Sequence, residues 1–182
     1  TIPAMSNVVQ HSAQGSIEVQ QDTLTISLST TRESPDSSSL QIQLKAALES
    51  ALAEAKKAVN GNGMAVRTGQ FNVSPRYDKN GKINGWQGNV ELILEGSDFE
   101  RIASTAGRIQ TLTVSNINFG LSRDQRVLAE SKAQAVAISR FKSKASEISK
   151  SFGFSTYTVR EVAIDTVDQG STPRPRVMSM EM

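Results

Sequence analysis

Apolar and polar residues alternate after Gly15 in a way that predicts a long β-strand. The alternation changes parity once, and its apolar members are Ile17, Val19, Leu24, Ile26 and Leu28. Because side chains in a strand repeat with a period of two, a change of parity requires one extra residue. The pattern therefore predicts a single strand with a bulge near residues 20–22. Residues 1–14 are polar and aperiodic, which predicts a loosely held N-terminal arm.

The next segment has helical periodicity. Its apolar residues are Leu40, Leu44, Ala47, Leu48, Ala51, Leu52, Ala55 and Val59. Ser34 is the predicted N-cap, with Pro35 at the first helical position, and Gly61 ends the run. We expect this amphipathic helix to cover a sheet.

Residues 71–90, FNVSPRYDKNGKINGWQGNV, predict a hairpin with an Asn80-Gly81 turn. That turn fixes the register, and the facing pairs are Phe71 with Val90, Val73 with Gly88, and Pro75 with Trp86. The large apolar groups then share one face, which we expect to pack inward. A parity change before this stretch predicts a second bulge near Gly69, and Pro75 predicts an edge or bulged position because proline has no N–H to donate.

Two interpretations of this hairpin differ in function. Its aromatic residues could form a ligand platform, with Arg76 and Asp78 as polar contacts. Alternatively, they fill a core otherwise built from aliphatic residues, and the register favours this interpretation because it places them on one face. Arg76 lies on the opposite face from Val73, where we expect it to pair with a carboxylate or to meet a partner subunit.

The second half of the chain predicts two more helices and two more strands. Capping-box sequences at residues 97–100 and 122–125 begin a short helix and a helix of about thirty residues that ends at Gly153. The strand between them carries Val114, Ile117, Phe119 and Leu121. A last strand carries Tyr157, Val159, Val162 and Ile164.

These elements predict an α+β sandwich in the order β-α-β-β-α-β-α-β, with a mixed or antiparallel sheet and helices packed on one face. Residues 15–168 form the predicted domain. Residues 169–182 form a tail that contains proline and methionine and that we expect to be mobile or docked on a neighbour.

Composition narrows the function classes. Twenty basic and eighteen acidic residues give a net charge of +2, which is too small an excess to predict a nucleic-acid partner. No apolar run is long enough for a transmembrane helix. The absence of cysteine excludes disulfides and thiolate chemistry. The chain begins at Thr1 without a charged and then apolar leader, which fits a mature or trimmed form.

The sequence gives little support for a catalytic, cofactor or metal site. A Ser-His-Asp triad would need His11, the single histidine, which lies in the predicted arm. Eighteen acidic residues allow many carboxylate pairs, but no metal-ligand spacing appears, and Gly61-Asn-Gly63 lacks the rest of a phosphate-binding loop. The sequence therefore predicts no catalytic residue, cofactor or metal ligand.

Several short motifs, in order and at their spacing, resemble the SIMPL-domain family, also called the periplasmic immunogenic protein family. They are Gly15-Ser-Ile-Glu-Val with Asp22, Phe71-Asn-Val-Ser-Pro-Arg-Tyr-Asp, Gly85-Trp86 with Asn89, Val114 through Ser122, and the alanine-rich long helix around Ala133, Ala137, Lys144 and Ala145 that Gly153 closes. The resemblance covers residues 15 to 165. It implies a periplasmic or secreted protein that forms homo-oligomers, has no known catalytic motif and in some bacterial members is linked to oxidative stress.

The leading hypothesis is a non-enzymatic exported protein that self-assembles and supports envelope integrity or stress tolerance. The alternatives are a module that binds a protein or ligand through the hairpin or the tail, and a hydrolase that uses a carboxylate pair. The predicted interaction surface consists of Pro75, Arg76, Tyr77 and Asp78 in the hairpin and Met178 and Met180 in the tail.

Overall fold

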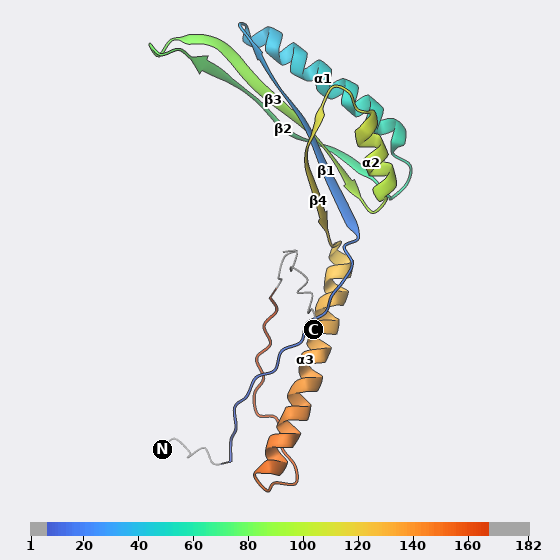
Figure 1. Ribbon diagram of the computed structural model, residues 1–182, viewed down its shortest axis with the longest axis vertical. Coiled ribbons are helices and arrows are strands. Elements are labelled where there is room, and N and C mark those ends of the chain that lie inside the picture. Colours follow the sequence, from blue (N-terminus) through green and yellow to red (C-terminus); the bar gives the residue numbers. More distant parts are fainter. Residues whose placement is uncertain (1–6, 168–182) are drawn as a thin grey trace, which may run out of the picture. The chain divides into compact units, whose positions relative to one another are not determined.

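The computed structural model describes residues 7–167, which form two compact units (Figure 1). The sheet unit consists of residues 19–126. The helical unit takes in residues 7–18 and 127–167. The predicted domain over residues 15–168 spans parts of both units, and its bounds stay a prediction.

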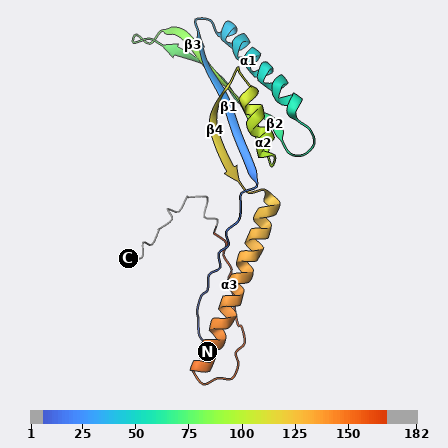
Figure 2. The ribbon, with the colours of Figure 1, turned by 45° about the vertical axis from the view of Figure 1, so that its right-hand side comes forward.

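The sheet unit is an α+β layer structure, as the sequence predicts. Its antiparallel sheet has the strand order β2-β3-β1-β4, so β2 and β4 are the edge strands. Helices α1 and α2 lie on the same face of the sheet (Figures 1 and 2). The elements are β1 (Thr23–Ser34), α1 (Ser37–Ala58), β2 (Ala65–Tyr77), β3 (Ile83–Gly96), α2 (Phe99–Arg108) and β4 (Thr113–Gly120).

Apolar residues between the sheet and the helices form the core. Helix α1 buries the predicted stripe of Leu40, Leu44, Ala47, Ala51 and Ala55. Against it lie alternate residues of the two central strands, namely Leu24, Ile26 and Leu28 of β1 and Val90, Leu92 and Leu94 of β3. The period-two and helical patterns of the sequence therefore meet in one core.

The hairpin has the predicted register from Phe71 to Arg76, and it shifts by one residue between Arg76 and Tyr77, so the connection spans residues 78–82. Phe71 pairs with Val90, and Pro75 pairs with Trp86. The register shifts between Thr68 and Phe71, which confirms the bulge expected near Gly69. Strand β2 is an edge strand, as Pro75 predicted.

The caps of α1 and α2 differ by a residue or two from the predicted ones. Asp36, not Ser34, caps α1, and its carboxylate accepts a hydrogen bond from the N–H of Ser39 at 2.9 Å. Ser34 is still part of β1, where it pairs with Trp86, so the strand extends to the residue before Pro35. Asp98 caps α2 in the same way, through the N–H of Arg101 at 3.1 Å.

Helix α3 (Arg123–Ser151) is the predicted long helix. The Ser122 hydroxyl accepts a hydrogen bond from the N–H of Gln125 at 3.3 Å, as in the predicted cap. The helix is followed by Gly153, whose φ of 85° is the left-handed conformation that ends helices.

Two predicted strand segments carry no strand. The first strand begins at Thr23, so residues 15–22 lie outside the ladder, and residues 157–164 have no regular structure. The ladders of β1 end where its partners end, with Leu24 opposite Gly96 and Thr23 opposite Gly120. The first seven elements follow the predicted order, and the eighth is not formed.

Candidate functional site

The predicted hairpin surface is largely engaged in holding the hairpin together. The Asp78 carboxylate accepts hydrogen bonds from the N–H groups of Asn80 at 2.8 Å and Lys82 at 3.0 Å, and Gly81 has the positive φ that the turn requires. Asp78 is therefore a turn residue. Tyr77, the residue before it, has 63% of its surface exposed.

Arg76 forms an ion pair with Glu33 of β1. Gly85 lies opposite Arg76 on the intervening strand β3 and has no side chain, which leaves the guanidinium a path across the strand. This is the carboxylate partner that the sequence predicted. Both side chains are well exposed, so the pair contributes little to stability.

The aromatic residues of the hairpin divide between core and surface. Trp86 and Val73 pack against the core, as expected. Phe71 is 44% exposed, so the expectation that all the large apolar groups pack inward is wrong for Phe71 and Tyr77. The physical reason is that β2 is an edge strand, so its side chains have a neighbouring strand on one side only. Met178 and Met180 lie outside the described residues.

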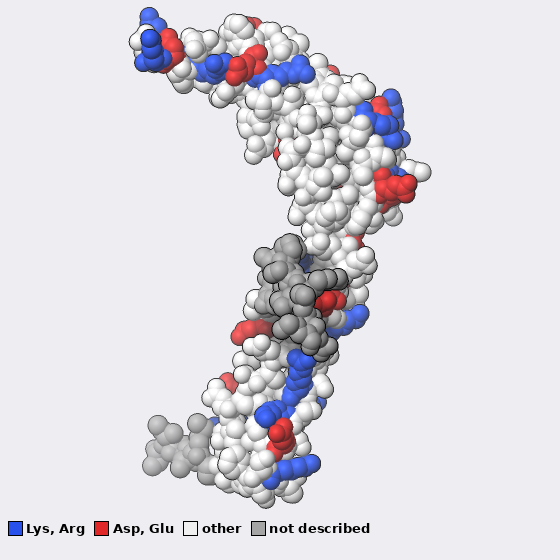
Figure 3. Space-filling model, in the orientation of Figure 1, with Lys and Arg blue, Asp and Glu red and all other residues white. Residues whose placement is uncertain are grey.

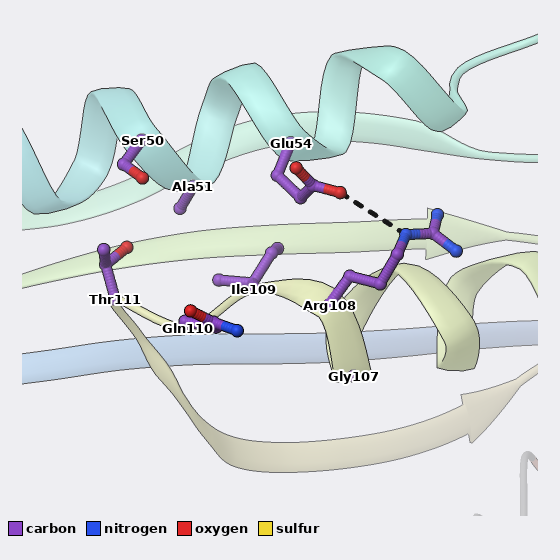
Figure 4. A pocket seen from close by; sticks show the side chains of 8 residues that line it. All are labelled: Ser50, Ala51, Glu54, Gly107, Arg108, Ile109, Gln110 and Thr111. Carbon is purple, nitrogen blue, oxygen red and sulfur yellow. Dashed lines mark ion pairs between the residues drawn. The ribbon is translucent and has the colours of Figure 1, made fainter.

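A pocket of about 530 Å³ lies between α1 and the connection from α2 to β4 (Figure 4). Glu54 is the one carboxylate among its lining residues, and it forms ion pairs with Arg108 at 3.4 Å and with Lys57 at 3.2 Å. The Thr111 hydroxyl donates to the carbonyl of Ala47 at 2.7 Å. Because Glu54 is the one acid in the lining and is paired with two cations, this pocket does not provide the pair of carboxylates that the hydrolase hypothesis requires. Among residues 7–167, no group of three or more metal-ligating side chains is present.

A carboxylate latch joins the start of β1 to the start of α3 within the sheet unit. Asp22 accepts two hydrogen bonds from Ser122, one from the backbone N–H and one from the hydroxyl, both at 2.6 Å. These hydrogen bonds, first the one from the hydroxyl and then the one from the N–H, lower the pKa of Asp22 below its ordinary value. Asp22 also donates its own N–H to the carbonyl of Gly120.

In the helical unit, the N-terminal segment lies against α3. A Cβ on Gly15 would come within 2.4 Å of the Ala133 carbonyl oxygen, so only glycine allows this approach. His11 stacks on Phe141 with ring centroids 4.1 Å apart, and its two ring nitrogens are buried without a hydrogen-bond partner. Arg140 donates to the carbonyl of Gln14 at 2.9 Å.

The C-terminal segment also lies against α3 and forms polar contacts with it. The Tyr157 hydroxyl donates to the carbonyl of Lys142 at 3.3 Å, and the Gln134 amide donates to the Thr166 hydroxyl at 3.5 Å. Both contacts are exposed to solvent.

Exposed apolar residues are the main feature of the helical unit. Ala129 is the one buried residue of α3. Large apolar side chains between 36% and 78% exposed occur in all three of its segments, namely Val8, Val9, Ile17, Val127, Leu128, Ile138, Phe152, Phe154, Tyr157, Val159, Val162, Ile164 and Val167. Basic and acidic residues are interspersed on the face shown in Figure 3, with broad uncharged areas between them.

The sheet unit has a smaller apolar surface on β4. Val114, Ile117 and Phe119, which we call the β4 row, pair with the buried residues Leu28, Ile26 and Leu24 of β1. The row is nevertheless 42–56% exposed. The sequence predicted the strand but not this exposure, because strand order is not visible in an alternating pattern.

One family profile covers nearly the whole chain. It is SIMPL, described as "Protein of unknown function (DUF541)", and it matches residues 9–182. The chain belongs to the SIMPL family. No curated protein matches this SIMPL chain. Among solved structures, "De novo designed protein Foldit4" is similar to it, with 16% sequence identity and a TM-score of 0.31 over 56% of the SIMPL chain and 99% of the designed chain.

Family membership confirms the resemblance carried by the short motifs, and three of the motif residues have structural roles. In this SIMPL chain Gly15 allows the close approach to α3, and Asp22 and Ser122 form the latch. Membership is consistent with an exported protein. None of the helices within residues 7–167 has the length and apolarity to cross a bilayer.

Proposed function

We propose that this SIMPL protein is a non-enzymatic structural protein that self-assembles through its helical unit. The observation that carries this proposal is the apolar surface of that unit, in which Ala129 is the one buried residue of the 29-residue helix α3. Large apolar side chains that gather in one part of a protein's surface mark interaction sites more often than scattered single ones.

Burial of this surface in an assembly is favourable because each Å² of apolar area removed from water contributes about 25 cal/mol. An exposed Val, Ile or Phe side chain therefore gains on the order of 1 kcal/mol or more when a partner covers it. Several such side chains lie on each of the three segments of the helical unit. Self-association supplies such a cover without any second protein.

The cellular part of the proposal rests on the family. We extend the resemblance to an exported protein, periplasmic or secreted, whose assembly supports envelope integrity or tolerance of oxidative stress. Deletion of the gene, followed by growth in detergent and in peroxide, tests this part. Growth equal to that of the parent strain in both conditions would contradict it.

Light scattering of the purified chain over a range of concentrations tests the assembly itself. We expect a defined oligomer at micromolar concentration. Replacement of Val162, 53% exposed in the helical unit, by Asp should weaken the oligomer, whereas replacement of Ile42, 69% exposed on α1 of the sheet unit, by Asp is the matched control and should not. A monomer at high micromolar concentration would refute self-assembly.

A second candidate function is a module that binds a protein or a ligand through the hairpin. The observation in its favour is the exposed apolar end of the hairpin, where Tyr77 pairs with Ile83 and both are more than half exposed. If the hairpin binds a partner, Tyr77→Ala should abolish binding of that partner without changing the oligomer. Retained binding in Tyr77→Ala would contradict this role.

A further inference from the structure

Strand β4 is the outermost strand on one side of the sheet. Within residues 7–167, β4 pairs with β1 on one side and has no strand on its other side. Unpaired backbone groups at such an edge are a template for strand addition. The β4 row adds apolar side chains on the face that bears the helices, and Phe99 of α2 meets Phe119 there with ring centroids 5.5 Å apart. An added strand would extend the existing core.

Residues 157–164 have the composition of a strand but no ladder. They include four large apolar residues, Tyr157, Val159, Val162 and Ile164, each 36–54% exposed. Aromatic and β-branched residues favour strands because they pack well on a pleated surface. The hydrogen bonds from Tyr157 to Lys142 and from Gln134 to Thr166 are exposed, so water can replace both when the segment leaves α3.

The apolar spacing of this segment matches that of β4 read in the opposite direction. From Tyr157 the steps to the next apolar residues are two and three, at Val159 and Val162. From Phe119 backwards the steps are also two and three, at Ile117 and Val114. In β4 the step of three reflects the register shift against β1. Paired one to one, the added strand would bulge at residues 160–161, opposite the bulge of β4 at Ser115, which keeps the apolar residues of both strands on one face.

We propose that residues 157–164 of a second copy add to the outer edge of β4 as an antiparallel strand, which deepens and rests on the proposed self-assembly. The register places Tyr157 opposite Phe119, Val159 opposite Ile117, and Val162 opposite Val114. These apolar pairs lie on the face that bears the helices. The polar residues Thr158 and Asn118 face each other on the opposite face.

The length of α3 requires that the strand come from another copy. Helix α3 has 29 residues and is about 42 Å long at 1.5 Å per residue. Tyr157 follows the helix end at Ser151 by six residues, which span at most about 21 Å, and Phe119 precedes the helix start at Arg123 by four residues, which span at most about 14 Å. Even with the cross-strand separation of about 5 Å added, the two connections reach about 40 Å, which is shorter than the helix, so Tyr157 cannot pair with Phe119 of its own chain.

Disulfide trapping tests the register, since the chain contains no cysteine of its own. Asn118→Cys and Thr158→Cys are made in separate chains, which are mixed, oxidised and separated on a non-reducing gel. We expect a covalent heterodimer, because directly facing residues lie within disulfide range. The control replaces Asn118→Cys by Asn116→Cys, which stands two residues out of register, and should give at least fivefold less heterodimer because its Cα separation from residue 158 exceeds that range.

The chain that carries both cysteines separates the sources of the strand. Copies joined covalently, as a dimer or a larger oligomer, are expected, whereas a monomer with an internal disulfide would overturn the assignment to a second copy. A Val159→Asp variant should associate at least tenfold more weakly than Thr158→Asp, because residue 159 faces Ile117 and residue 158 faces away. Equal association of the two variants would overturn the face assignment.

Light scattering distinguishes failure of this ladder from failure of the proposed function. An oligomer that shows no enrichment of the 118–158 disulfide would overturn the ladder and leave self-assembly standing. A chain that is monomeric at every concentration would overturn both.

Discussion

Leu44 provides a quantitative test of the core that supports the sheet. Its side chain is fully buried on the inner face of α1. A Cβ on Gly88 of β3 would come within 2.7 Å of the Leu44 Cδ1 atom, so the leucine occupies the space above a residue that has no side chain. Leu44→Ala removes three carbon atoms from this position.

The expected cost combines two terms. Loss of burial costs about 0.8 kcal/mol for each carbon removed, which gives about 2.4 kcal/mol. The remaining cavity adds to this, and Leu→Ala substitutions in well-packed cores cost about 2.7–5 kcal/mol in total. Because Gly88 has no side chain that can move into the space, we expect a decrease of about 3–4 kcal/mol in the free energy of unfolding.

Urea denaturation followed by tryptophan fluorescence measures this change. Trp86 is the single tryptophan and packs against the same core, so its emission reports unfolding of the sheet unit. Ile42→Ala on the same helix is the matched control, because Ile42 is 69% exposed. It should change the free energy by less than about 0.5 kcal/mol. A Leu44→Ala variant no less stable than Ile42→Ala would refute the assignment of this helix face to the core.

Three further predictions concern other parts of the chain. Trp86→Ala should lower the free energy of unfolding by about 2–3 kcal/mol, measured by denaturation followed by circular dichroism. This is less than a fully buried tryptophan would lose, because Trp86 is partly exposed. An unchanged free energy would place Trp86 outside the core. The Asp22 pKa is lowered on folding, so the stability that its latch contributes is present above about pH 3.8 and is lost as the pH falls through the lower, folded-state pKa; Asp22→Asn should remove this acid dependence, and an unchanged pH profile would contradict the latch. Gly15→Ala should detach the N-terminal segment from α3, seen as faster amide exchange in residues 7–18, and unchanged exchange would contradict the close approach to Ala133.

Local signals in the sequence predicted much of the sheet unit. The Asn80-Gly81 turn predicted the hairpin register, and the structure has the same pairs from Phe71 to Arg76, including Pro75 with Trp86, before a one-residue shift next to the turn. The apolar stripe of α1 and the positive-φ glycine after α3 were also predicted correctly. Such features depend on residues that are close together in the chain, where turn chemistry and periodicity act directly.

The two missed segments show the limit of periodicity. Residues 15–22 and 157–164 alternate as strands do, but a strand forms only where a neighbour supplies hydrogen bonds. Inside the described part of the chain Gly15 and Tyr157 contact α3 instead. Gln21 and Asp22 donate hydrogen bonds to carbonyls at the end of β4 without forming a ladder. The alternation shows that these segments are compatible with a strand. Whether a ladder forms depends on whether another strand lies next to them.

The contacts between distant residues could not be predicted from the sequence. The latch joins Asp22 to Ser122, 100 positions away. Both residues stood in the motifs of the family resemblance, but nothing in the sequence paired them. The exposure of the β4 row depends on the strand order, which places β4 at an edge. By itself, the sequence determined the class of the fold, the hairpin register and the family resemblance, because these follow from local chemistry and the spacing of short motifs. Only the tertiary structure decided which apolar faces are covered, because burial depends on neighbours that the order of residues along the chain does not specify.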